Sequence, residues 1–151
     1  MHKAIAGAKA ARSEEFEAWQ AEGRRQLEML DARAAGQAFQ RMIAAALEAA
    51  DLPTAHEALR QAVAGLGECL ALTQEAQVRQ PAFRALFQAY RADACSSGDG
   101  LTRDIPYLML RRAMPAERAM LIRWAREALS AHDEVPAEAY WRLLLDLADA
   151  G

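Results

Sequence analysis

Apolar side chains recur at steps of three or four residues through almost the whole chain, which is the spacing of one face of an α-helix. Phe16, Trp19, Gly23, Leu27 and Leu30 form one such stripe. No segment shows the strict alternation of apolar and polar residues that is typical of a strand. Alanine, the best helix former, supplies 37 of the 151 residues. The sequence therefore predicts an all-α fold.

The apolar spacing and the turn residues predict six to seven helices. The expected helices cover residues 13–34, 37–50, 55–78, a stretch from 81, then 104–113, 115–130 and a stretch from 136. Short connections favour antiparallel neighbours, so we expect stacked antiparallel hairpins or an irregular helical bundle in a single domain, residues 1–151. Residues 1–12 either extend the first helix or fray. The loop at 95–101 separates a four-helix part from a three-helix part.

Capping residues are expected to mark several helix starts. Ser13 is a candidate N-cap for the first helix, because a hydroxyl can accept a bond from a free backbone N–H. Thr54 followed by Glu57 has the spacing of a capping box, which predicts a short turn just before it. Thr102 or Asp104 is expected to cap the helix that follows the 95–101 loop.

Proline and glycine residues indicate further helix starts and helix irregularities. Pro81, Pro106 and Pro115 are each expected in the first turn of a helix, where the missing N–H costs nothing. Gly65 and Gly67 fall inside an expected helix, where they indicate a close helix crossing or a kink.

Composition and net charge argue against a membrane location, against general attraction of nucleic acid and against disulfide bonds. The net charge is −3, so no overall field attracts nucleic acid or an anionic membrane. No apolar run approaches the roughly 20 residues of a membrane span, and no signal-peptide pattern opens the sequence. Cys69 and Cys95 are too few for a disulfide framework. We expect a cytoplasmic protein with two reduced thiols and no membrane contact.

The sequence gives no positive signal for catalysis, for a cofactor or for a metal. His2, His56 and His132 have no acid three residues before them, so the glutamate–histidine spacing of di-iron bundles is absent. Phosphate-binding glycine loops and nucleophile motifs are absent too. The enzymatic alternative is a site in an inter-helix cleft, for which a pair of Cys95 and His132 is conceivable.

A basic segment between residues 103 and 126 is the main charge asymmetry. It contains Arg103, Arg111, Arg112, Arg118, Arg123 and Arg126. Two acids oppose these six arginines, so the segment carries +4 and the remainder −7. A helix-turn-helix at 104–130 that contacts nucleic acid is the second hypothesis. Against it, the last three arginines spread over about 140° of a helical wheel and form no single reading face.

The last expected helix is apolar on nearly every side, in the run "AYWRLLLDLA". Such a helix lies either at the centre of a fold or under a partner. The candidate partner-binding residues are Tyr140, Trp141, Leu144, Leu145 and Leu147. Exposed apolar surface usually marks an interaction site. The leading hypothesis is therefore a non-catalytic domain for protein–protein interaction, scaffolding or self-association.

Overall fold

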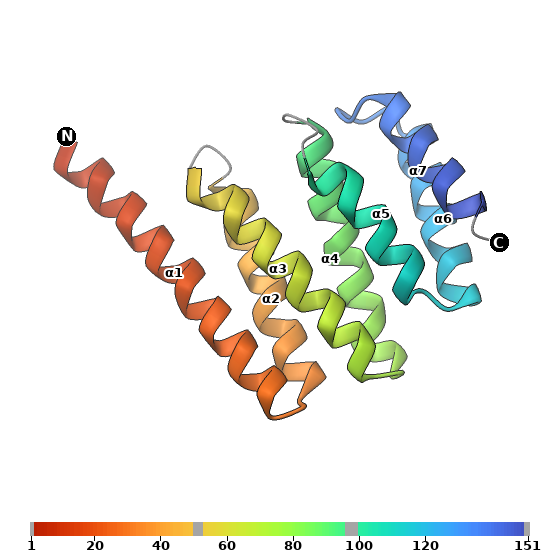
Figure 1. Ribbon diagram of the computed structural model, residues 1–151. Helices are drawn as coiled ribbons and strands as arrows, with labels where there is room; N and C mark the ends of the chain where they lie inside the picture. Colours follow the sequence, from red (N-terminus) through yellow and green to blue (C-terminus); the bar gives the residue numbers. More distant parts are fainter. Residues whose placement is uncertain (1, 50–52, 96–99, 150–151) are drawn as a thin grey trace. The chain divides into compact units, whose positions relative to one another are not determined.

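The computed structural model describes residues 2–49, 53–95 and 100–149, which form seven α-helices and, within these ranges, no strand (Figure 1). The helices are α1 His2–Glu28, α2 Ala32–Glu48, α3 Pro53–Leu72, α4 Ala76–Cys95, α5 Leu101–Arg112, α6 Pro115–Ser130 and α7 Ala137–Asp149. The prediction of an all-α fold is confirmed. The chain divides into two compact units, Met1–Ala85 and Leu86–Gly151, and the division falls inside α4.

The first unit is built around Phe39, whose side chain is completely buried. Helices α1, α2 and α3 pack side by side (Figure 1), and the Phe39 ring of α2 lies against Gly23 of α1 and Gly65 of α3. A β-carbon added to Gly23 would lie 2.5 Å from Phe39 Cζ, and one added to Gly65 would lie 2.5 Å from Phe39 Cε1. Both positions need glycine because the ring occupies the space of a side chain. The close crossing predicted at Gly65 is confirmed.

The second unit has an aromatic core. The Phe87 ring of α4 lies 6.1 Å from the Trp124 ring of α6, at 56°, and 6.3 Å from the Tyr140 ring of α7, at 23°. The Tyr90 hydroxyl donates a hydrogen bond of 2.8 Å to the Ala139 carbonyl oxygen. Helix α7 also packs on α6 and α5. One face of α7 is therefore fixed by both packing and hydrogen bonding.

Two charged side chains of α4 are buried, and both bond the ends of other helices. Arg79 donates hydrogen bonds to the carbonyl oxygens of Leu70 and Thr73, the latter at 2.8 Å, at the end of α3. Asp93 accepts a bond of 2.7 Å from the Thr102 N–H at the start of α5. Helix ends leave such groups without partners inside the helix, so these two buried charges stabilise helix ends.

Of the two alternatives for residues 1–12, extension of the first helix is found for residues 2–12, while the predicted N-cap Ser13 and the predicted end of that helix at 34 are wrong. Helix α1 already covers residues 2–12, so Ser13 is no N-cap; its hydroxyl oxygen lies 3.2 Å from the hydroxyl oxygen of Thr54. The chain turns at 29–31, where Asp31 accepts a bond of 3.0 Å from the Ala34 N–H and caps α2. This turn contains neither glycine nor proline, the residues that usually reveal one.

The predicted capping box of α3 is not formed as expected. The helix begins at Pro53, which places Thr54 inside its first turn, where the hydroxyl contacts Ser13 and not the α3 backbone. Residues 51 and 52 of the predicted turn lie outside the described residues.

The prediction that each proline lies in the first turn of a helix is wrong for two of the three. Pro81 and Pro106 lie inside α4 and α5, one turn or more after their starts. Helix α4 can begin early because the Thr73 hydroxyl accepts a bond of 3.1 Å from the Glu75 N–H. Helix α5 can begin at residue 101 because Asp93 caps it across space, in place of the expected Thr102 or Asp104. Pro115 is the first residue of α6, as predicted.

Candidate interaction surfaces

Helix α7 is amphipathic, which divides the five candidate partner-binding residues into two groups. Tyr140, Leu144 and Leu147 face the core with at most 9% of their surface exposed. Trp141 and Leu145 lie one turn apart on the outer side and are 58% and 61% exposed. We call these two residues the α7 face. Only two of the five predicted partner-binding residues are therefore exposed.

A hydrogen-bonded network holds α7 in place. The Tyr140 hydroxyl donates to Asp133 Oδ2 at 2.6 Å and accepts from Arg91 Nε at 2.9 Å, while Arg91 Nη2 lies 2.8 Å from the same Asp133 oxygen. Burial, and then the bond to Asp133, raise the pKa of Tyr140 to about 12. Bonds from Tyr140, the Val135 N–H and Arg91 outweigh burial and lower the pKa of Asp133. Tyr140 is thus a structural residue and not an accessible anchor.

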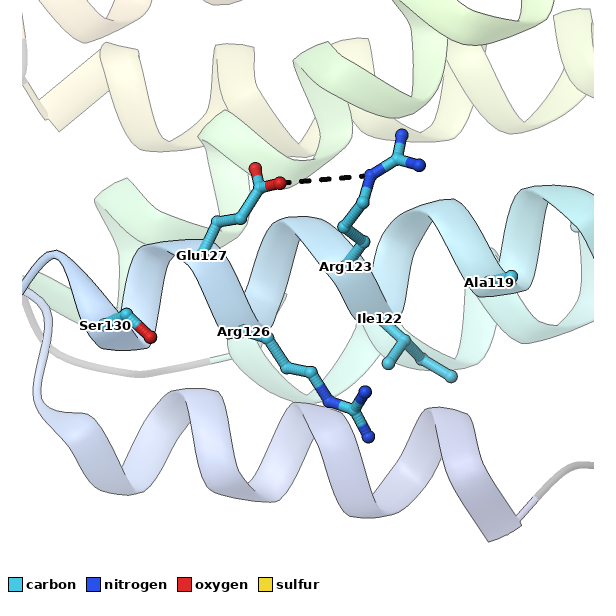
Figure 2. A pocket seen from close by; sticks show the side chains of 6 residues that line it. All are labelled: Ala119, Ile122, Arg123, Arg126, Glu127 and Ser130. Atoms are coloured by element: carbon cyan, nitrogen blue, oxygen red, sulfur yellow. Dashed lines mark ion pairs between the residues drawn. The ribbon is translucent and has the colours of Figure 1, made fainter.

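The arginines on α6 do not converge. A hollow of about 420 Å³ lies along this helix. Figure 2 shows that two of its lining side chains, Arg123 and Arg126, point in different directions. Arg123 Nε lies 3.9 Å from Glu127 Oε1, which neutralises part of its charge. Arg118 is half-buried, and so is Arg112 at the end of α5. Within the described part of the chain, the side chains that line this hollow come from α6.

The arginines on α5 form a more regular pattern. Arg103, Tyr107 and Arg111 follow one another at four-residue steps and are all exposed, with Tyr107 at 70%. They lie on the side of α5 opposite the buried residues Ile105 and Met109. We call these three residues the α5 stripe. Arg103 has a long ion pair, 3.6 Å, with its neighbour Asp104; for Arg111 the described part of the chain shows no ion pair.

A further surface, which sequence reasoning missed, lies at the turn between α1 and α2. Met29 and Leu30 are 65% and 73% exposed, and Leu72 at the end of α3 is 44% exposed. These side chains border a hollow of about 440 Å³ that Asp31, Arg33 and Glu75 also line. We call this the turn hollow. No residue in the sequence marks this surface, because Leu30 continues the apolar spacing of the first predicted helix.

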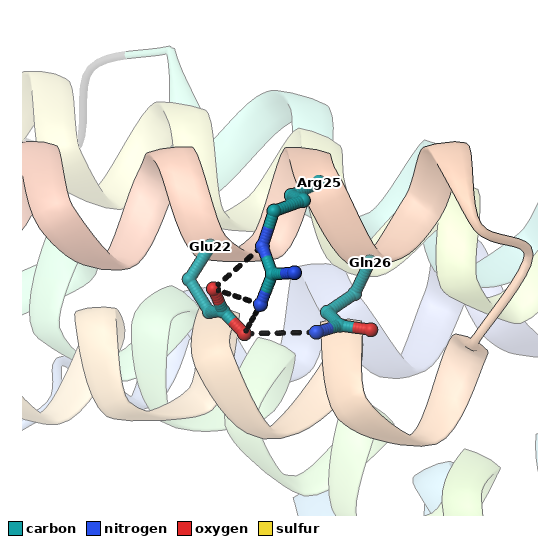
Figure 3. Close-up of polar contacts among 3 residues, drawn as sticks. All are labelled: Glu22, Arg25 and Gln26. Atoms are coloured by element: carbon teal, nitrogen blue, oxygen red, sulfur yellow. Dashed lines mark hydrogen bonds and ion pairs between the residues drawn. The ribbon is translucent and has the colours of Figure 1, made fainter.

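The polar surface of α1 shows ordinary ion pairing. Two nitrogens of Arg25 lie 2.8 to 3.1 Å from the carboxylate oxygens of Glu22, and the Gln26 amide nitrogen lies 2.9 Å from the same carboxylate (Figure 3). The bond from Gln26 and then those from Arg25 lower the pKa of Glu22. The three residues satisfy one another along one exposed helix face, so they bring no unused group toward a ligand.

The surroundings of Cys95 disfavour its proposed role as a nucleophile. Burial, and then the nearby Glu134 and Asp133, raise the pKa of Cys95, which disfavours the reactive thiolate. Among the described residues, no group of three or more histidine, cysteine, aspartate and glutamate side chains could hold a metal ion. The described helices also include none that is long and apolar enough to span a membrane.

Comparison with known proteins adds no assignment. No protein family, no curated protein and no solved structure matches this chain.

Proposed function

We propose that this protein is a non-catalytic helical interaction domain that binds another protein, or a second copy of itself, through the α7 face. The observation that carries the proposal is the exposure of Trp141 and Leu145, one turn apart on a helix that the rest of the unit holds rigidly. Tryptophan is a typical anchor of protein interfaces. Neither side chain is needed for the core, which Leu143 and Leu147 already fill.

The size of the α7 face indicates the strength of the interaction. Covering the exposed parts of Trp141 and Leu145 removes roughly 250 Å² of apolar surface per copy, so a dimer through two α7 faces buries roughly 500 Å², well below the roughly 1,200 Å² of a specific, stable interface. Association itself costs about 4 kcal/mol or more. The α7 face alone therefore supports a weak dimer, and a tighter complex requires a partner that also contacts neighbouring residues.

Paired variants of α7 test the proposal. Trp141→Glu with Leu145→Glu removes the α7 face, while Arg142→Ala with Asp146→Ala changes two exposed residues with the same spacing on the polar side of the same helix. Sedimentation velocity from about 1 μM to about 1 mM measures self-association. Quantitative affinity purification with the two variants as matched baits measures binding of another protein.

We expect the polar-side variant to behave like the parent protein and the α7-face variant to lose its partner. The proposal is wrong if the parent protein stays monomeric over the whole range and no co-purified protein distinguishes the two baits.

A further inference from the structure

The turn between α1 and α2 places a leucine where the backbone favours glycine. Leu30 has φ of 60°, in the left-handed region. The Leu30 N–H donates to the Leu27 carbonyl and the Asp31 N–H to the Gln26 carbonyl, both at 2.9 Å, which is the bonding pattern of a Schellman cap. Glycine is the usual residue at this position because it has no β-carbon. Leu30 therefore opposes the local backbone preference.

The Leu30 side chain also contributes little to the core. It is 73% exposed, and the neighbouring Met29 is 65% exposed. A glycine here would relieve the backbone strain and would remove apolar surface from water at the same time. Strain that the fold does not need is a reason to look for a function. Since Leu30 borders the turn hollow together with Leu72, the side chain is placed to contact a ligand there.

The turn hollow has a recognisable chemistry. Its aliphatic residues, Met29, Leu30 and Leu72, lie beside Asp31 and Glu75. Arg33 lies 3.3 Å from Glu75, so the charged residues that line the hollow sum to −1. A volume of about 440 Å³ admits an aromatic side chain. The complementary ligand is therefore an aromatic residue with a cationic residue close to it.

The α5 stripe presents this combination. Tyr107 is 70% exposed, and one helical turn separates it from an exposed arginine on either side, Arg103 and Arg111. Aromatic and arginine side chains are enriched at protein interfaces. Arginine can also bond a carboxylate through two nitrogens.

We infer that the α5 stripe of one copy docks on the turn hollow of a second copy. Tyr107 lies against Leu30 and Leu72, and the flanking arginines meet the acidic residues around the hollow. The contact joins two different surfaces. In a pair, the copy that uses its stripe therefore keeps a free hollow, and the copy that uses its hollow keeps a free stripe. Such head-to-tail contacts produce rings or open chains of copies and not a closed dimer. This inference uses neither residue of the α7 face and can therefore fail independently of the proposed function.

Complementation between two variants tests this inference. Leu30→Gly removes the strained apolar side chain of the hollow and keeps the stripe intact, while Tyr107→Ala removes the aromatic side chain of the stripe and keeps the hollow intact. Sedimentation velocity should show parent assemblies that grow beyond dimers with concentration, and each variant should associate at least about tenfold more weakly. An equal mixture of the two variants should form a dimer of one copy each and stop there, because only one matching pair of surfaces remains.

Folding is checked separately. Leu30→Gly should unfold at the same or a higher temperature than the parent protein, which excludes misfolding as the cause of lost association. A parent protein that is monomeric up to about 1 mM, or a mixture that stays monomeric, overturns the inference. It is also overturned if Tyr107→Ala abolishes a low-salt RNA mobility shift and leaves the assemblies unchanged, because the stripe then binds nucleic acid. Assemblies lost only in the Trp141→Glu, Leu145→Glu variant support the α7 face and refute the head-to-tail contact.

Discussion

The sharpest quantitative prediction concerns the two glycines that hold the Phe39 ring. In an exposed helix, replacing glycine with alanine stabilises the protein by about 0.5 to 1 kcal/mol. At Gly65 the added β-carbon would lie 2.5 Å from both Phe39 Cε1 and Cε2. Phe39 cannot move away easily, because Gly23 of α1 touches the same ring from another helix. Overpacking of this kind costs about 1 to 3 kcal/mol.

We therefore expect Gly65→Ala to lower the free energy of unfolding by about 1 to 2 kcal/mol, and Gly23→Ala to behave similarly. Gly36 provides the control, since a β-carbon there would meet only the Gln40 amide nitrogen, at 3.7 Å. Gly36→Ala should raise the free energy of unfolding by about 0.5 to 1 kcal/mol. Urea denaturation followed by far-ultraviolet circular dichroism measures all three variants.

A double variant tests the cause of the destabilisation. Phe39→Leu shortens the side chain and should cost stability in the parent protein through the cavity that it leaves. In the Gly65→Ala background the same change should cost less, because it also removes the clash. The packing argument is refuted if Gly65→Ala is as stable as the parent protein, or if the costs of Gly65→Ala and Phe39→Leu simply add.

Three further predictions concern the second unit. Asp93→Ala removes the bond to the start of α5, so thermal unfolding should show a loss of about 1 to 2 kcal/mol, with Asp93→Asn in between because an amide oxygen can still accept. Folding raises the pKa of Tyr140 from 10 to about 12. Its contribution to stability is therefore present below pH 10 and lost as the pH rises through about 12, and urea denaturation of Tyr140→Phe over this range should show a shallower decline. The arginines of α6 do not converge and α5 presents only Arg103 and Arg111 on one face, so the parent protein should not retard duplex DNA at about 50 mM salt. A shift that Arg111→Glu with Arg126→Glu removes would contradict the choice of a protein partner.

Helix positions could be predicted well where side-chain periodicity decides them. The sequence pattern identified the all-α fold, and a proline suited to a first helical turn identified the start of α6 at Pro115, because both depend on local sequence. Boundaries failed where a distant residue decides them. Helix α5 begins at residue 101 because Asp93 of α4 supplies its cap, and no local pattern reveals that bond.

The candidate surfaces were predictable only in part, for a related reason. The sequence shows that α7 has more apolar residues than one buried stripe needs, but packing decides that Tyr140 lies inside and Trp141 outside. The α1–α2 turn was hidden because Leu30 continues the apolar spacing of the helix before it. Periodicity identifies residues that can be buried. A residue such as Leu30 fits the period but lies just beyond the end of its helix, so the fold leaves it exposed.

The distribution of polar groups favours outer faces over an inter-helix cleft as the place of function. The buried charges Arg79 and Asp93 bond helix ends, and the half-buried Asp133 bonds Tyr140. Two large apolar side chains, by contrast, are exposed to solvent. A helical fold gains free energy by burying a tryptophan or a leucine, yet Trp141 is 58% exposed and Leu30 is exposed in a strained conformation. Both proposed contacts therefore use side chains at the outer faces and helix ends.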